Sequence, residues 1–142
     1  PMPDNSGRTI IENLLDPTKI YVSIILEILK NINDIKALSH ITGGGLTENL
    51  PRIFPTHNIG AKINLSSWKR PAIFNWIQKL GNIDENEMLK TLNCGIGMVL
   101  IVNTNTAKEL SEYLLSKKEN FYIIGEIIEI KKEDPKIIFV KD

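Results

Sequence analysis

The sequence is poor in the residue types that build disulfide frameworks and zinc sites. It contains one cysteine, Cys94, and two histidines, so no internal disulfide can form and a zinc cluster is not expected. No apolar run reaches the length of a transmembrane helix, and no signal peptide is visible. These absences favour a protein of the reducing cytoplasm that has no membrane partner.

Net charge is also lacking, because 17 basic side chains balance 17 acidic ones. No basic stripe indicates nucleic-acid binding, and no acidic tail indicates a solvating segment. A chain of 142 residues is long enough for one domain with a sizeable core. We expect residues 1–13 to form a flexible linker, because Pro1 to Gly7 are loop-forming, and residues 14–142 to form the domain.

Helical and strand-like patterns alternate along the chain. Asp16 and Pro17 offer a cap and a first helical residue, and apolar residues then recur at helical spacing through Leu29. Further helices are expected over 46–53, 71–80, 84–92 and 106–117, and strands over 35–41, 59–65, 97–102, 122–130 and 136–140. The last two strands are expected to pair with each other through a turn at 133–135. The pattern predicts an α+β fold, an α/β sandwich in which a mixed β-sheet is flanked by helices.

Three consecutive glycines after the first predicted strand form the most informative motif. Thr42, Gly43, Gly44 and Gly45 lie between apolar residues and a predicted helix. Glycine permits positive φ and the close approach of a ligand, and the free N–H groups of a following helix attract anions. The motif predicts a phosphate or carboxylate cradle, although a plain tight connection explains the glycines equally well.

Three polar residues flank this turn, and each has two interpretations. His40 could act as a base or donate to a phosphate, or it could be a partly buried histidine bonded to backbone. Arg52, seven residues past Gly45, could bind a phosphate or form a salt bridge. Asn49 could donate its amide to a ligand or make a capping or turn contact.

A second glycine-bearing turn follows the helix predicted over 84–92. Asn93 and Gly95 could allow another close approach to a ligand, and a simple helix-to-strand connection is the competing interpretation. Cys94 has no histidine partner or basic neighbour in sequence, so it is not expected to be a nucleophile. Asp84, Glu85 and Glu87 could suggest a metal, but the preference of acids for a helix N-terminus accounts for them and no metal site is expected.

Nearly the whole chain resembles the C-terminal domain of the phosphoribosylformylglycinamidine cyclo-ligase family, the aminoimidazole ribonucleotide synthetases. The matching residues run in the same order and are Leu14 to Val22, His40 to Arg52, Trp68, Pro71 to Trp76, Gly81-Asn82, Glu87-Met88 and Asn93 to Met98. The chain departs from the family pattern at Ser39, Asn64, Lys90 and Leu92. These departures are mild and leave the roles of Lys90 and Asn64 open.

The resemblance implies a function for the whole protein. Members of this family use ATP to close the ring of formylglycinamidine ribonucleotide, giving aminoimidazole ribonucleotide, ADP and phosphate in de novo purine (IMP) biosynthesis. ATP and Mg²⁺ are expected to be bound mainly by an N-terminal domain whose acidic motif is not in these residues, so residues 1–13 would be the linker from it. The resemblance further implies a cytoplasmic homodimer, with Thr42 and Gly43 to Gly45 holding phosphorylated substrate and with Asn49, Arg52 and His40 in support.

Two alternatives remain open from the sequence. Other ATP-using enzymes share this architecture, among them formylglycinamidine ribonucleotide synthetase, thiamine monophosphate kinase, selenophosphate synthetase and a hydrogenase maturation factor. A non-catalytic anion-binding module could use the same cradle. The stretch from Glu48 to Arg52 and the stretch from Trp68 to Trp76 favour the cyclo-ligase.

Overall fold

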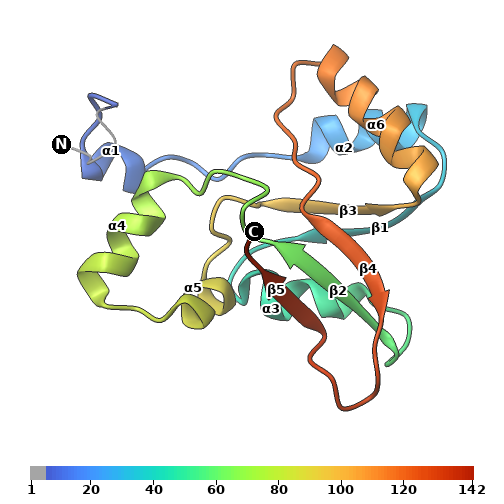
Figure 1. The fold of residues 1–142 in the computed structure, drawn as a ribbon. Coiled ribbons are helices and arrows are strands. Elements are labelled where there is room, and N and C mark those ends of the chain that lie inside the picture. The colour runs from blue at the N-terminus through green and yellow to red at the C-terminus, as the bar shows by residue number, and fades with distance from the viewer. Residues whose placement is uncertain (1–5) are drawn as a thin grey trace.

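The computed structural model describes residues 6–142 and has an α+β fold in which helices flank small β-sheets (Figure 1), which confirms the expected fold class. The helices are α1 (Ile10–Leu14), α2 (Val22–Asn31), α3 (Gly45–Asn49), the 3-10 helix η1 (Leu50–Ile53), α4 (Ala72–Gly81), α5 (Glu85–Thr91) and α6 (Thr104–Ser116). The strands are β1 (Ile35–His40), β2 (Ile59–Asn64), β3 (Met98–Val102), β4 (Gly125–Glu129) and β5 (Ile137–Val140). Within residues 6–142, no helix has the length and apolar character needed to span a membrane.

The strands form two hydrogen-bonded sheets. β1 and β3 make an antiparallel ribbon in which His40 lies opposite Met98. In the second, mixed sheet β2 is central and pairs antiparallel with β4 and parallel with β5. The expected pairing of the last two strands with each other is therefore wrong. That expectation rested on nearness in sequence, but β2 offers two edges and carries the buried residues Ala61 and Ile63, so both strands pair with it.

Helix α2 begins at Val22, five residues later than the sequence pattern predicts. The expected cap is not used, because the carboxylate of Asp16 accepts two hydrogen bonds from the Arg8 guanidinium, at 2.8 and 2.6 Å. Tyr21 takes the N-cap position instead. Residues 17–21, called the strap below, have no regular structure and connect α1 to α2 across the molecule (Figure 1).

Part of the segment expected to be a linker is helical. Helix α1 starts with a capping box, in which the Thr9 hydroxyl accepts from the Glu12 N–H and the Glu12 carboxylate accepts from the Thr9 N–H. Residues 1–5 of that segment lie outside the described residues. Whether the segment joins this domain to another one stays a prediction.

Helices α4, α5 and α6 confirm the helices predicted over 71–80, 84–92 and 106–117. Capping hydrogen bonds and backbone conformation explain where they begin and end. Helix α4 ends at Gly81, and its C-cap Asn82 has a φ of 48°, the left-handed conformation common at that position. Asp84 caps α5 by accepting from the Asn86 N–H at 2.8 Å, and Asn103 caps α6 by accepting from the Thr106 N–H at 2.8 Å. These elements form where the sequence supplies both an apolar face and a cap.

The β1–β3 ribbon is packed on both faces, which makes it a firm support. Its inner face joins the main core with the second sheet, and Ile41 and Leu46, each 1% exposed, anchor the two ends of the glycine turn there. Its outer face packs against α2 and α6 through Ile28, Ile32 and Leu110, and Figure 1 shows these two helices together on that side. The glycine turn therefore follows a strand that is held from both sides.

Candidate functional site

The three glycines of the turn lack side chains for different reasons. Gly44 and Gly45 have φ values of 106° and 56°, which disfavour any residue with a Cβ. A Cβ on the buried Gly45 would also overlap the carbonyl oxygen of Leu89, so Gly45 lets α3 pack closely on α5. Gly43 has no atom within 4 Å of an added Cβ and is exposed. The accessible part of the turn is therefore the stretch around Gly43.

Asn49 holds this turn in shape from the inside. Its side chain is almost wholly buried, and its Nδ2 donates to the carbonyl oxygen of Gly43 at 3.0 Å. Its Oδ1 accepts from the Thr42 hydroxyl at 3.3 Å, and a Cβ on Gly44 would come within 2.6 Å of its Nδ2. The amide of Asn49 is thus engaged within the turn, as the capping or turn interpretation of the sequence anticipated.

The turn leaves backbone donors available. Within residues 6–142, the N–H groups of Gly43 and Gly44 donate no hydrogen bond, whereas the Gly45 N–H donates to the Thr42 carbonyl at 3.0 Å. Glu48 lies beside Gly44, and its carboxylate is 3.8 Å from the Lys90 ammonium. A negatively charged ligand would meet least repulsion on the Gly43 side of the turn.

His40 and Arg52 lie on different sides of this turn. Neighbouring residues of a strand point to opposite faces, and Ser39 donates its hydroxyl to the Asn49 carbonyl at 3.3 Å on the inner face. His40 is exposed on the outer face, where its ring meets the edge of Tyr21 at a centroid distance of 5.8 Å. Arg52 is exposed on η1 and has no hydrogen bond or ion pair within the part of the chain that the structure describes.

The structure brings the second glycine turn next to the first. The Ile41 N–H donates to the Gly97 carbonyl at 2.8 Å, which joins the end of β1 to the residue before β3. Asn93 accepts from the Gly95 N–H at 2.9 Å through its side chain, and Gly95 has a φ of 102°. A Cβ on Gly95 would lie 2.5 Å from the Pro71 ring. These contacts show a packed helix-to-strand connection, while the direct ligand contact predicted for Asn93 and Gly95 stays a prediction.

The acidic residues around α5 are engaged in protein contacts. Asp84 caps the helix, Glu85 binds the Arg70 guanidinium, and Glu87 accepts from the Thr91 hydroxyl at 3.0 Å. Among residues 6–142 there is no group of three or more side chains that could hold a metal ion. Cys94 is buried, and burial raises the pKa of its thiol, which disfavours the nucleophilic thiolate.

Sequence reasoning missed the contribution of the strap to this region. An apolar hollow of about 420 Å³ lies next to His40, and six of its eight lining residues come from the strap and α2. The eight are Thr18, Lys19, Ile20, Tyr21, Val22, Ile25, His40 and Met98. The stretch from Leu14 to Val22, which matches the cyclo-ligase pattern, is the sequence signal for this contribution. The Asp16-Pro17 pair within it predicts the start of a helix instead. An extended strap, and not a helix, places Tyr21 beside His40.

Comparisons with known proteins agree with this fold. Two structures of the E. coli hydrogenase maturation protein HypE are similar, one with a TM-score of 0.63 and 23% identity and the other with a TM-score of 0.60 and 24% identity. They cover 86% and 85% of this chain, which spans only 39% of each HypE chain. The family model described as "AIR synthase related protein, C-terminal domain" matches residues 3–138. The chain therefore belongs to the AIR synthase related proteins, as a C-terminal domain of that family.

Proposed function

We propose that this chain is the C-terminal half of a phosphoribosylformylglycinamidine cyclo-ligase. The whole enzyme, a cytoplasmic homodimer, would close the imidazole ring of aminoimidazole ribonucleotide at the expense of ATP. The observation that carries the proposal is the His40–Arg52 stretch, which matches the cyclo-ligase pattern in a chain of this family and forms a glycine turn with an accessible residue at Gly43.

The turn would hold a phosphate of the substrate or of ATP. The N–H groups of Gly43 and Gly44 are short, neutral donors on a firmly packed strand end, and Thr42 supports them through the hydrogen bond from its hydroxyl to Asn49. The Arg52 guanidinium on η1 could donate two further hydrogen bonds to the phosphate. Asn49 and Gly45 would contribute by fixing the turn, so that its donors need no reordering when the ligand binds.

Ring closure also needs groups that these residues do not supply. ATP phosphorylates the formyl oxygen, the neighbouring amidine nitrogen attacks the activated carbon, and phosphate leaves. Mg²⁺ neutralises charge on the triphosphate in such reactions. The described residues contain no cluster suited to that ion. ATP and Mg²⁺ would therefore be bound mainly by the N-terminal domain of the whole protein, and this chain would hold the substrate.

A second candidate is another ATP-using relative within the same architecture. The fold similarity to HypE, a hydrogenase maturation protein, supports this second candidate, because that similarity extends over 86% of the chain. A fold shared at this level of identity serves more than one reaction, so the ligand must decide between the candidates.

The test is an assay of the full gene product with ATP, Mg²⁺ and formylglycinamidine ribonucleotide. ADP and aminoimidazole ribonucleotide should appear in equal amounts. Gly43→Ala and Arg52→Ala should each lower kcat/KM by about tenfold or more, because they crowd or remove a phosphate contact. Lys132→Ala, which removes an exposed charge in the β4–β5 connection, is the control and should leave the rate unchanged.

Other outcomes contradict the proposal in distinct ways. ADP release without aminoimidazole would assign the chain to another ATP-using relative. No product from a folded protein that still binds inorganic phosphate would indicate a non-catalytic anion-binding module. Full activity of both Gly43→Ala and Arg52→Ala would show that the glycine turn is not the cradle.

A further inference from the structure

Tyr21 contacts both polypeptide segments that lead into the candidate site. Its ring stands edge-on to the His40 imidazole, with an interplanar angle of 65° and 5.8 Å between centroids. Within residues 6–142, the His40 imidazole has no hydrogen bond or ion pair, and the Tyr21 ring is its aromatic contact. Tyr21 itself is half-buried.

The hydroxyl end of Tyr21 lies directly on the backbone of Gly97. A Cβ at Gly97 would overlap the Tyr21 hydroxyl and lie 2.9 Å from the ring carbon that carries it. Gly97 is the residue whose carbonyl accepts the Ile41 N–H at 2.8 Å. Glycine at this position therefore lets Tyr21 pack against the junction between the two glycine turns.

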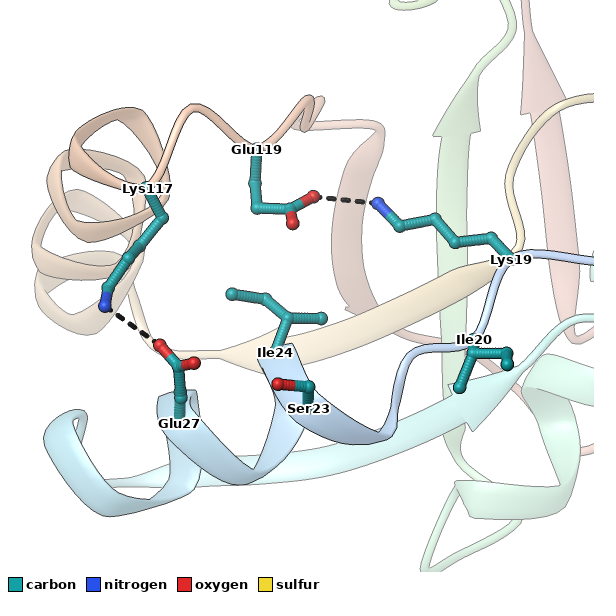
Figure 2. A pocket seen from close by; sticks show the side chains of 7 residues that line it. All are labelled: Lys19, Ile20, Ser23, Ile24, Glu27, Lys117 and Glu119. Atoms are coloured by element: carbon teal, nitrogen blue, oxygen red, sulfur yellow. Dashed lines mark hydrogen bonds and ion pairs between the residues drawn. The ribbon is translucent and has the colours of Figure 1, made fainter.

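The strap that carries Tyr21 is held from the other side by α6 and the residues after it. The Lys19 ammonium lies 5.5 Å from the Tyr21 ring centroid and 2.8 Å from the Glu119 carboxylate. A second ion pair, from Lys117 to Glu27 at 2.9 Å, joins the end of α6 to α2, the helix that follows the strap (Figure 2). Exposed ion pairs of this kind are individually weak, so we assign most of the restraint on the strap to the packing of the Tyr21 ring.

These contacts form a continuous path from Glu119 through Lys19 and Tyr21 to His40. We propose that Tyr21 is a positioning residue, which orients the His40 imidazole and braces the Gly97 junction beside the glycine turn. The Lys19–Glu119 pair adds a weak contact between the strap and the residues after α6. The orientation of His40 can be tested without any ligand, whereas the effect of Tyr21 on the rate of ring closure rests on the proposed function.

The orientation of His40 can be measured by NMR in the 142-residue chain. The chain has only two histidines, and His57 serves as an internal reference because it lies in an exposed loop. The ring current of Tyr21 should displace the His40 Hε1 resonance, and Tyr21→Leu should move that resonance toward the position seen for His57. Tyr21→Phe should keep it in place, because the ring remains, and the His57 signal should be constant throughout.

An unchanged His40 resonance in folded Tyr21→Leu would overturn the proposal. If Tyr21→Leu does not fold, a nuclear Overhauser measurement on the unmodified chain decides, because the Tyr21 and His40 rings lie edge-on with 5.8 Å between their centroids. A cross-peak between the ring protons of Tyr21 and His40 supports the proposal, and its absence contradicts it.

The catalytic consequence is tested in the full gene product. Tyr21→Leu should lower kcat for ring closure by about 10- to 100-fold with little change in the KM for ATP, and Tyr21→Phe should restore the rate. A displaced His40 with an unchanged kcat would show that Tyr21 does not act on the site. Absence of ring closure in the wild-type protein would contradict the proposed function instead, and the NMR result would still stand.

Discussion

At the scale of single residues, some positions of the glycine turn are required for packing, and another is accessible to a ligand. Gly45 and Asn49 are buried and contact other parts of the protein, whereas Gly43 is exposed with open space beside it. Substitutions at these positions should therefore divide into those that change stability and those that change binding.

Gly45→Ala should lower the free energy of unfolding by about 2 kcal/mol or more, because φ is 56° and the new Cβ would overlap the Leu89 carbonyl oxygen. Gly43→Ala is the matched control and should change it by no more than about 0.5 kcal/mol. Urea unfolding followed by circular dichroism measures both. Equal losses in the two variants would show that the turn is not packed as described.

Asn49→Ala should destabilise the protein by about 1–3 kcal/mol, because it removes a buried amide that bonds Gly43 and Thr42. Asn120→Ala provides the comparison, since Asn120 is exposed outside the helices and strands, and it should be nearly neutral. The same urea titration compares them. A neutral Asn49→Ala would mean that the turn keeps its shape without the side chain.

At the scale of the elements, α5 is attached by charge and hydrogen bonding to α4 and to the loop that precedes α4. The Arg70 guanidinium donates to Glu85 at 3.1 Å, and Gln78 donates to the same carboxylate at 2.8 Å. The hydrogen bonds from Arg70, followed by the one from Gln78, lower the pKa of Glu85 against the opposing effect of burial. This attachment brings α4 and α5 together around the loop that contains Trp68.

The stability that Glu85 contributes should depend on pH. Because its folded-state pKa is lowered, the contribution is fully present above the unfolded-state value of about 4.3 and is lost as pH falls through the folded-state pKa. Glu85→Gln should therefore destabilise the protein at pH 7 by at most about 1 kcal/mol, since the side chain is 43% exposed, and should have little effect near pH 2. Urea unfolding at the two pH values tests this, with Glu109→Gln on the exposed side of α6 as the control. An equal loss at both pH values would contradict the charge assignment.

The elements also show where sequence patterns stop being informative. The amphipathic faces and caps of α4, α5 and α6 are local, so their positions could be predicted within a few residues. The start of α2 could not, because Arg8 competes for the Asp16 carboxylate from eight residues away. The partners of β4 and β5 could not either, because both depend on which edges of β2 remain free after the chain collapses.

At the scale of the whole molecule, the chain spans 39% of the HypE chains that it resembles. We predict that the isolated 142 residues bind ligand weakly and do not catalyse ring closure, because the acidic ATP-binding motif expected from the cyclo-ligase family is not in them. The assay for ADP and aminoimidazole ribonucleotide, run on this chain beside the full gene product, measures the difference. Detectable ring closure by the isolated chain would disprove the division of roles between the two halves.

By itself, the sequence determined the α+β class, the positions of α4, α5 and α6 and the location of the glycine turn, because periodicity, capping and glycine conformation act between near neighbours. Only the tertiary structure decided that β2 lies between β4 and β5, that Asn49 points into the turn and that His40 faces Tyr21. These features depend on contacts between segments far apart in sequence. The physical reason is that an apolar face requires burial and a polar side chain requires a hydrogen-bond partner. The packing of the whole chain selects which segment provides them.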